Sequence, residues 1–454
     1  MPKFPRLFLI GSSDEEDPSD CTLALIAALH HDGFTVQHFR SVSAFSPVDH
    51  VTPVTGVSSR HLDPWIMDPT LCRELFSHTA AAADISIIEA CRPAQMRLAP
   101  QEPPATQRQL GLGGDGDWEL LAQTLNCPVV AVVPSQATAK YHGRKVPDYV
   151  DALLLDGVPS RAHFDVEKTA VESVSGKPVL GGLVRKHSLR DGKVKTGDMQ
   201  RPGVATIEEL RTSLLEVTDL SKVISLAHSR PAPSQSTELF AREKRRRLCV
   251  AIAYDDCFRC YFPDTLDVLE FLGAELREFS PLNDERLPEE SDIVYFGCGH
   301  PEKFARGLSE NECMRAALRS HVSSGRRVYA EGGGTAYLCQ RLRLPSGVMY
   351  PMVGVFPAET DFTGSAAARP VPVELRCHRS TWIAAPGEIV RGYHSGAWRL
   401  RDLGGLGSCF ASGADQPEIV VRHHCVGSMI HLNLAAYPRV LDAFFAPHAP
   451  SLCL

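Results

Sequence analysis

The sequence predicts an α/β protein with two domains, each built on a parallel sheet covered by helices. Short apolar runs, typical of buried strands, alternate with helical segments along nearly the whole chain. This alternation implies parallel sheets with helices on both faces. The chain has 454 residues, which is too long for one ordinary core, so two domains or slightly more are expected.

Composition and charge exclude several classes of protein. An apolar content of 44% and a charged content of 22% are ordinary for a globular protein, and no run approaches the roughly 18 apolar residues of a membrane span. The net charge of −7 argues against a nucleic-acid or anionic-membrane partner. The N-terminus begins directly with a strand and has no signal-peptide pattern. The 14 cysteines lie in apolar contexts, so we expect reduced thiols and a cytoplasmic location.

The first half of the chain reads as alternating strands and helices. One strand, 83–89, ends in a carboxylate, Glu89. The Pro/Gly-rich segment 92–117 is expected to be a long irregular loop. The expected strands are 7–10, 33–39, 83–89, 128–134, 152–155 and 178–184, and the expected helices include 21–29, 68–82 and 117–125.

The loop after the first strand has the layout of a phosphate-binding loop but not its chemistry. A phosphate cradle needs glycines and a Lys, whereas Asp14, Glu15, Glu16 and Asp17 supply four carboxylates. These carboxylates would repel a triphosphate, so a solvated acidic turn that caps a helix is favoured over nucleotide binding. A divalent cation held by the loop is the weaker alternative.

A linker separates the two halves. The segment 227–237 is rich in Pro and Ser and is followed by a basic run, 242–247. We therefore expect a first domain at 1–225, a linker at 226–247 and a second domain at 248–454. The basic run is interpreted as a solvated flank ahead of a strand rather than as a binding patch.

The second half is again predicted to be α/β, with a different tail. Short strands in the tail are typical of an antiparallel edge, and a closing strand at 428–434 carries His431. The expected elements are strands at 248–253, 274–279, 292–296 and 327–330, helices at 261–272 and 310–323, and tail strands at 371–375, 389–391 and 418–422.

One stretch of the second half reads as a strand-to-helix elbow. The strand 327–330 runs into three glycines, 332–334, and then into a helix. In α/β enzymes such an elbow exposes a nucleophile at the end of the strand, and the following N–H groups stabilise an oxyanion. Here the residue at the tip, Gly332, has no side chain.

Several motifs in one order identify a resemblance. Over nearly its whole length the chain resembles the cobyrinic acid a,c-diamide synthase family. The resemblance implies an N-terminal P-loop amidoligase domain of the dethiobiotin-synthetase type and a C-terminal class I glutamine amidotransferase domain, which is flavodoxin-like. The matching segments are Val250–Phe258, Tyr261–Asp264, Phe279–Asp284, Gly297–Glu302 (similar to GGGYPE), Tyr329–Gly334 (similar to A-E-C-G-G), Tyr350–Val355, Arg391–Gly396 and Ser428–His431.

The same comparison shows where the chain departs from the family pattern. Gly332 stands in the place of the nucleophilic Cys, and Pro18 stands in the place of the phosphate-binding Lys. The chain thus reads as a degenerate member, and MgATP is not an expected cofactor. Residues kept from the family's R-N-L-D-x-W segment include Arg60 and Asp63; together with Glu89 they are structural or belong to the tetrapyrrole-side surface.

The resemblance also assigns the candidate site residues of the second domain. His431 occupies the position of the family's catalytic His. Because the partner Cys is missing, His431 is interpreted as retained by ancestry or packing. Glu331 and three glycines are candidate binding residues around the elbow; these glycines are Gly297, Gly299 and Gly333. Cys298 is the alternative nucleophile, although a packing role is favoured for it.

No metal site is predicted from the cysteine spacing. Cys257 and Cys260 have metal-like spacing, but a zinc site needs four ligands and no His lies near them in sequence.

Three functions are left open by the sequence. The favoured one is a binding or regulatory protein that holds a tetrapyrrole or corrinoid, or that joins a catalytically active partner protein. The second is amidation of a corrinoid carboxylate with ATP or free ammonia, with Asp63 and Glu89 as survivors. The third is new chemistry in the old cleft. A homodimer is among the expected assemblies.

Overall fold

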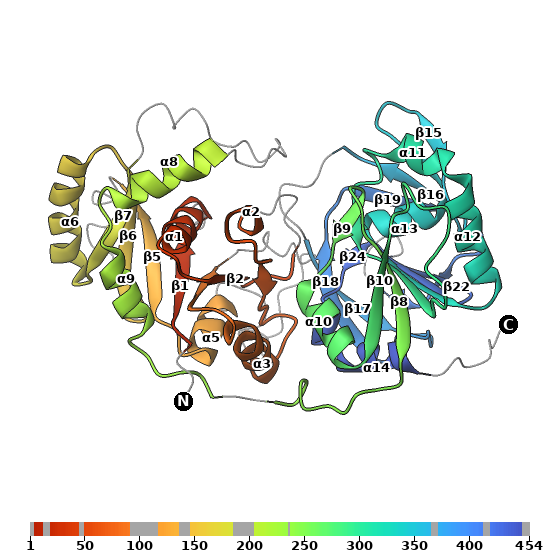
Figure 1. The fold of residues 1–454 in the computed structure, drawn as a ribbon, viewed down its shortest axis with the longest axis horizontal. Coiled ribbons are helices and arrows are strands. Elements are labelled where there is room, and N and C mark those ends of the chain that lie inside the picture. Colours follow the sequence, from red (N-terminus) through yellow and green to blue (C-terminus); the bar gives the residue numbers. More distant parts are fainter. Residues whose placement is uncertain are drawn as a thin grey trace, which may run out of the picture. The chain divides into compact units, whose positions relative to one another are not determined.

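A computed structural model describes residues 4–11, 19–44, 50–90, 117–135, 146–184, 204–234, 237–364, 371–411 and 418–446. They form two compact units that divide after Glu238, and each unit contains a seven-stranded sheet (Figure 1). The acidic residues 14–17, Pro18 and most of the long loop predicted at 92–117 lie outside the described residues. The predictions made for them therefore stay predictions.

The sheet of the first unit is parallel throughout. Its strand order is β3-β2-β4-β1-β5-β6-β7, and each neighbouring pair runs in the same direction. All of the strands predicted for this half are present, and β3 is an additional short edge strand. The strands are β1 (Arg6–Gly11), β2 (Val36–Arg40), β3 (Arg60–His61), β4 (Ile85–Glu89), β5 (Val129–Pro134), β6 (Ala152–Val158) and β7 (Val179–Val184).

Helices connect these strands, and local chemistry sets where they begin and end. The Asp68 carboxylate caps α3 by accepting hydrogen bonds from the N–H groups of Thr70 and Leu71. Ser160 caps α6, which ends at Gly176 in the left-handed region with φ of 66°. The helices are α1 (Ser19–His31), α2 (Thr52–Thr55), α3 (Pro69–Ala80), α5 (Asp117–Thr124), α6 (Arg161–Ser175), α8 (Val204–Leu215) and α9 (Leu220–Ala227).

A buried arginine at the start of β1 ties the first unit to the chain that leaves it. The Arg6 guanidinium donates to the carbonyl oxygens of Phe4, Leu125, Asn126 and Pro231 at 2.5–2.8 Å. Only 1% of the residue is exposed. Because Pro231 lies in the predicted linker, the first part of that linker is packed against the first unit.

The sheet of the second unit is parallel with an antiparallel edge, in the order β10-β8-β11-β13-β23-β22-β20. The pairs from β10 to β23 are parallel, and β22 and β20 run antiparallel. The strands are β8 (Leu248–Ala253), β10 (Ala274–Phe279), β11 (Ile293–Phe296), β13 (Arg327–Glu331), β20 (Gly407–Ser408), β22 (Ile419–Arg422) and β23 (Cys425–Ser428).

Smaller sheets complete the second unit. One pairs β9 with β12; a second has the order β15-β14-β16-β19, and a third has the order β21-β17-β18-β24. Their strands are β9 (Phe258–Cys260), β12 (Cys298–Gly299), β14 (Cys339–Arg343), β15 (Met349–Pro351), β16 (Phe356–Phe362), β17 (Val371–Cys377), β18 (Ile389–His394), β19 (Trp398–Asp402), β21 (Phe410–Ala411) and β24 (Ile430–His431). The helices are α10 (Pro263–Phe271), α11 (Ala305–Glu310), α12 (Glu312–Ser323), α13 (Gly333–Leu338), η2 (Leu434–Ala436) and α14 (Pro438–Phe445).

Two expectations for the tail were wrong in detail. The strands predicted at 371–375 and 389–391 do not edge the main sheet but lie in the third small sheet. The closing strand predicted at 428–434 is broken, because the Ser428 hydroxyl bonds both the carbonyl oxygen and the N–H of Ile430. His431 is therefore carried by β24, outside the main sheet.

The basic run 242–247 is largely exposed and leads directly into β8, as predicted for a solvated flank, and its arginines also contact the rest of the second unit. Arg242 and Arg245 form ion pairs with Asp442 on α14, and Arg247 pairs with Glu275 on β10. Arg246 donates to the carbonyl oxygens of Phe445 and Ala446. The run thus fastens the start of the second unit to its own last helix and edge strand.

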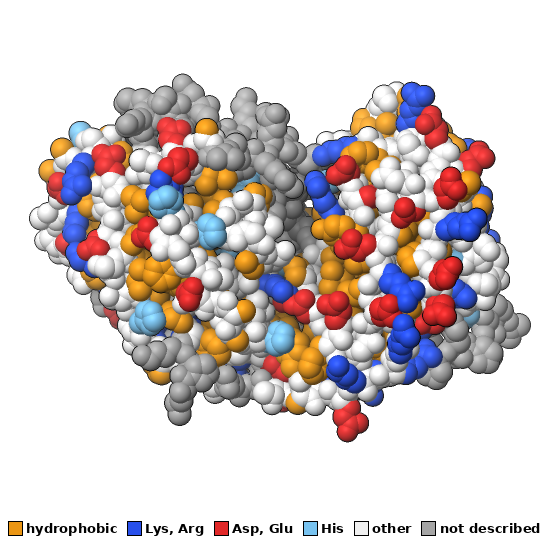
Figure 2. All heavy atoms as spheres, in the orientation of Figure 1, with side chains coloured by type: hydrophobic (Ala, Val, Ile, Leu, Met, Phe, Trp, Pro, Cys, Tyr) orange, Lys and Arg blue, Asp and Glu red, His pale blue; other side chains and the backbone are white. Residues whose placement is uncertain are grey.

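The visible surface of the second unit carries interspersed charges. Positive and negative side chains alternate over this face without a large area of one sign (Figure 2). Among the described helices, none has both the length and the apolar content that crossing a bilayer requires.

Candidate functional site

The predicted elbow is present at the carboxyl end of β13. Gly332 joins β13 to α13 with φ of 48° and ψ of −114°, a conformation that L side chains rarely adopt. Its N–H donates to the Ser428 carbonyl at 2.7 Å, and the Thr335 hydroxyl lies within hydrogen-bond distance of that carbonyl and of the Ala330 carbonyl. The strained turn of a nucleophile elbow is therefore kept, although its tip has no side chain.

Glycines let a second segment lie against the elbow. A Cβ atom at Gly299 would lie 2.1 Å from the Cys257 carbonyl oxygen, and one at Gly333 would lie 2.5 Å from the Gly299 carbonyl oxygen. At Gly297 it would lie 2.4 Å from the Cys260 carbonyl oxygen. Close backbone approach thus accounts for all three glycines predicted to bind a ligand. It also fixes the segment between β11 and α11 beside the elbow.

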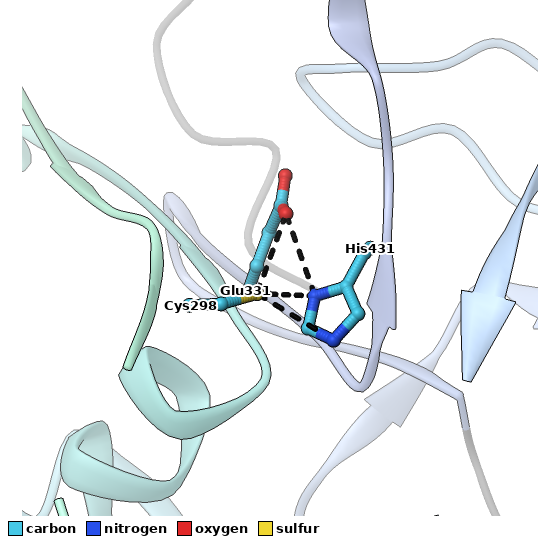
Figure 3. Close-up of side chains that lie close together, drawn as sticks. All are labelled: Cys298, Glu331 and His431. Carbon is cyan, nitrogen blue, oxygen red and sulfur yellow. Dashed lines mark hydrogen bonds and ion pairs between the residues drawn. The ribbon is translucent and has the colours of Figure 1, made fainter. Parts of the chain in front are cut away.

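Three buried side chains, those of Cys298, Glu331 and His431, converge at one point (Figure 3). Cys298 and His431 both lie close to Gly332. The Cys298 sulfur forms a hydrogen bond with Nδ1 of His431 and lies 3.6 Å from Nε2 of the same ring. Oε2 of Glu331 lies 3.9 Å from the Cys298 sulfur and 3.9 Å from Nδ1 of His431. The residues come from β12, β13 and β24, so three separate sheet segments meet at one point.

The Glu331 carboxyl is held in a protonated form at neutral pH. Burial raises its pKa to about 8, and hydrogen bonds from the Tyr329 and Tyr295 hydroxyls and from the Leu432 N–H oppose that rise. The Tyr329 hydroxyl donates to Oε1 at 2.8 Å, and only 1% of Glu331 is exposed. The carboxyl thus organises the site through hydrogen bonds and carries little negative charge at pH 7.

The thiol and the imidazole are both uncharged at rest. Burial raises the pKa of Cys298 well above its usual value, and the nearby Glu331 adds to that rise. Burial lowers the pKa of His431 to about 3, with a smaller contribution from His394. A thiol beside a neutral imidazole can transfer its proton during attack on a carbonyl carbon, which is the chemistry of acyl transfer.

The same three side chains could instead hold a metal ion. Their ligand atoms all lie within 4.8 Å of one another, and a thiolate with an imidazole suits a soft divalent ion such as zinc. The sequence predicts no metal ligand here, because these residues are distant in sequence and only the fold brings them together.

The structure separates the predicted site residues into two groups. Gly297, Cys298, Gly299, Glu331, Gly332, Gly333 and His431 lie together in the second unit. Arg60, Asp63 and Glu89 lie in the first unit, at the carboxyl edge of its sheet.

The first-unit candidates lie where three strands end side by side. The register places Arg40 beside both His61 and Glu89. Glu89 is 4% exposed, and its Oε2 lies 3.6 Å from Nε2 of His38. Asp63 is 1% exposed and accepts a hydrogen bond from the Trp65 N–H, so it stabilises a turn. Arg60, partly exposed, is the one of the three predicted residues that a ligand could reach directly.

Sequence reasoning missed the polar groups that support the centre. Tyr329 stands two residues before Glu331 on β13, so alternation along a strand places both side chains on one face. That spacing was the available signal. Glu418 and His394 form a second pair, 3.6 Å apart, next to β24, and no sequence signal links them.

Glu331 is expected to contribute a loss of stability as pH rises through the neutral range. Below the ordinary Glu value of 4.5, Glu331 is protonated whether folded or unfolded; between 4.5 and about 8 only the unfolded chain ionises this group. The folded state then holds this proton and the unfolded chain does not, so the contribution of Glu331 to the free energy of unfolding decreases with pH. Glu418, with a pKa raised to about 7 by burial, acts in the same direction.

Glu331→Gln is therefore expected to reduce the stability lost between about pH 5.5 and about pH 8.5 by roughly 2–3 kcal/mol. Chemical denaturation at both pH values measures this difference. Glu310→Gln, an exposed carboxyl on α11, is the matched control and should leave the pH slope as it is in the wild type. An identical slope in the Glu331→Gln variant would show that Glu331 is ionised in the folded protein.

Comparisons with known proteins show what the chain is similar to. Residues 249–435 match the family described as a CobB/CobQ-like glutamine amidotransferase domain. Cobyrinate a,c-diamide synthase of Syntrophotalea carbinolica is 28% identical over 467 residues, covering 97% of this chain and 98% of the relative. The Picrophilus torridus protein of the same name is 30% identical, over 69% of this chain and 72% of its own. A solved glutamine amidotransferase is 19% identical over 43% of this chain and 96% of its own, with a TM-score of 0.35.

Proposed function

Since the chain belongs to the cobyrinate a,c-diamide synthase family, we propose that it binds a tetrapyrrole of the cobyrinate type and has lost the ATP-dependent amidation of that ligand. The relatives named above are described as synthases, and the two halves of this chain depart from the family pattern in different ways. The first unit keeps residues of the ligand side and lacks the phosphate-binding lysine.

One observation carries the proposal. Arg60, Asp63 and Glu89 are kept at the carboxyl edge of the first sheet, while Pro18 stands in the place of the lysine. In open α/β sheets, ligands bind outside the carboxyl ends of the strands. Glu89 pairs with Leu9 of β1, two residues before the strand ends, so it adds a carboxyl group beside the strand that leads into the acidic loop. This arrangement disfavours a triphosphate and leaves the rest of the edge for another ligand.

Two titrations test the proposal. Absorbance titration with cobyrinate and with other corrinoids and tetrapyrroles should give a saturable spectral change with at least one of them. Calorimetric titration with MgATP should give no binding heat. Arg60→Met should weaken the tetrapyrrole complex, whereas Arg161→Met, on the exposed α6, should not. Tight MgATP binding, or no spectral change with any tetrapyrrole, contradicts the proposal.

Amidation with free ammonia is the second candidate function. The buried carboxyl groups of Asp63 and Glu89 favour it, because they survive at the strand ends where the family activates its substrate. Incubation with cobyrinate, ammonium and MgATP, followed by mass spectrometry, separates the two candidates. An amide product establishes the second candidate. Light scattering of the same samples measures whether the chain forms the proposed homodimer.

A further inference from the structure

The sulfur of Cys298 lies close to where a side chain from the elbow would be. A Cβ atom built on Gly332 would lie 3.4 Å from the Cys298 sulfur and 2.9 Å from Cε1 of His431. The space beside the imidazole is therefore already occupied. One thiol fits there, and it arrives from β12 instead of from the elbow.

The two departures from the family pattern at this point are reciprocal. The family's GGGYPE segment has a glycine where this chain has Cys298, and its A-E-C-G-G segment has a cysteine where this chain has Gly332. The two positions are far apart in sequence and in contact in the structure. Cysteine and glycine have thus exchanged places across one contact, and the number of thiols beside His431 is unchanged.

Space filling alone does not account for the centre. An apolar side chain would fill the gap, and burying an imidazole and a carboxyl group costs free energy that hydrogen bonds must offset. His431 is 7% exposed and Glu331 is 1% exposed, yet both remain. His431 forms a hydrogen bond with the thiol, and Glu331 lies 3.9 Å from it. The polar partners of a nucleophile are therefore kept around the relocated sulfur.

We propose that Cys298 has replaced the elbow cysteine as the nucleophile, so that the second unit hydrolyses a primary carboxamide such as the side chain of glutamine. This inference goes beyond the proposed function, which concerns ligand binding and the first unit. It needs neither a tetrapyrrole nor a nucleotide. His431 is the base, and Glu331 is a positioning residue that holds the site through Tyr329 and Tyr295.

The reaction proceeds in two balanced steps. The sulfur attacks the carboxamide carbon, the C–S bond forms, and the thiol proton passes to Nδ1 of His431. The imidazolium gives this proton to the amide nitrogen, the C–N bond breaks, and ammonia leaves a thioester on Cys298. Water then attacks the thioester and loses a proton to His431. The C–S bond breaks, the sulfur regains its proton, and a carboxylic acid is released.

Burial decides which reagents reach the thiol. Cys298 is only 6% exposed and His431 only 7% exposed. Simple alkylating agents should therefore react slowly at neutral pH, whereas an electrophile shaped like glutamine should react fast.

The test uses the full chain and a diazoketone analogue of glutamine as the probe. We expect peptide mass spectrometry to find the label on Cys298 and excess glutamine to block it. Ammonia release from glutamine should fall on the order of 10³-fold in Cys298→Ala. Cys339→Ala removes another fully buried thiol, which bonds the Thr335 carbonyl, and should keep the wild-type rate. Cys298→Ser, which has nearly the same volume, repeats the test if the Ala variant fails to fold.

An exchange variant keeps the test decisive. Cys298→Gly combined with Gly332→Cys returns both residues to the family pattern. If this variant hydrolyses glutamine and the wild type does not, Cys298 only fills space and the inference is overturned. Hydrolysis that survives in Cys298→Ala, a label on another cysteine, absence of hydrolysis in both forms, or one bound zinc per chain also overturns it. None of these outcomes bears on tetrapyrrole or MgATP binding, so the proposed function stands or falls separately.

Discussion

Gly332→Cys alone is expected to lower the free energy of unfolding by about 2–4 kcal/mol. The new Cβ atom would lie 2.9 Å from Cε1 of His431 and 3.4 Å from the Cys298 sulfur, and a side chain at φ of 48° is itself strained. His431 is part of β24, its ring lies against the elbow and it is 7% exposed, so the ring has little room to withdraw. Urea denaturation of the wild type and the variant measures the loss.

The second substitution of a double-mutant cycle should recover part of that loss. Removing the sulfur with Cys298→Gly clears the 3.4 Å contact and gives the imidazole space to turn. We expect a coupling free energy of about 1–2 kcal/mol in favour of the double variant. Additive effects of the two substitutions would mean that the two positions do not compete for the same space, contrary to the geometry described above.

Arg6→Met is expected to cost about 3–5 kcal/mol, the larger of the two stability losses. The substitution leaves the carbonyl oxygens of Phe4, Leu125, Asn126 and Pro231 without the donor that now serves all four. Only 1% of Arg6 is exposed, so little water reaches the group, and this burial lowers its pKa. A thermal scan should show the transition of the first unit at a clearly lower temperature.

An exposed arginine provides the control for this prediction. Arg161 at the start of α6 also donates to a carbonyl oxygen, that of Glu216, but in contact with water. Arg161→Met should change stability by less than about 0.5 kcal/mol. An equal loss in both variants would assign the effect to the removal of positive charge and not to the four buried carbonyl groups.

The sequence predicts most of the strands because they are short apolar runs buried on both faces. Strands β1, β4, β5, β8 and β13 were found in this way. The pattern failed where polar residues form strands or turns. The edge strand β3 has two residues, Arg60 and His61, and no apolar run marks it.

Two predicted element boundaries were wrong for the same reason: in each case a single polar side chain ends one element and begins another. Asn311 caps α12 and splits the predicted helix 310–323, and Ser428 breaks the predicted strand 428–434. The helix after the elbow is short: α13 ends at Leu338, and β14 begins at the buried Cys339.

The sequence motifs predicted only part of the candidate site. Motif order placed Glu331, Gly332 and His431 around one elbow, and the structure confirms that they are neighbours. It did not reveal that Cys298 bonds His431, because the contact depends on the pairing of β12 with β9 and on glycines that bring two backbones together. The sequence did hold a signal for this contact. One motif has lost a cysteine and the other has gained one, and a position-by-position comparison of the two motifs could have revealed the pair.

The turn at Ser428 gives the centre two mechanical supports. Glu331 ends a strand of the large sheet, whereas His431 belongs to β24, which pairs with β18 in the four-stranded sheet. Only Met429 separates β23 from β24. The carboxyl group and the imidazole of one centre are therefore held by two different sheets, which are joined at Met429.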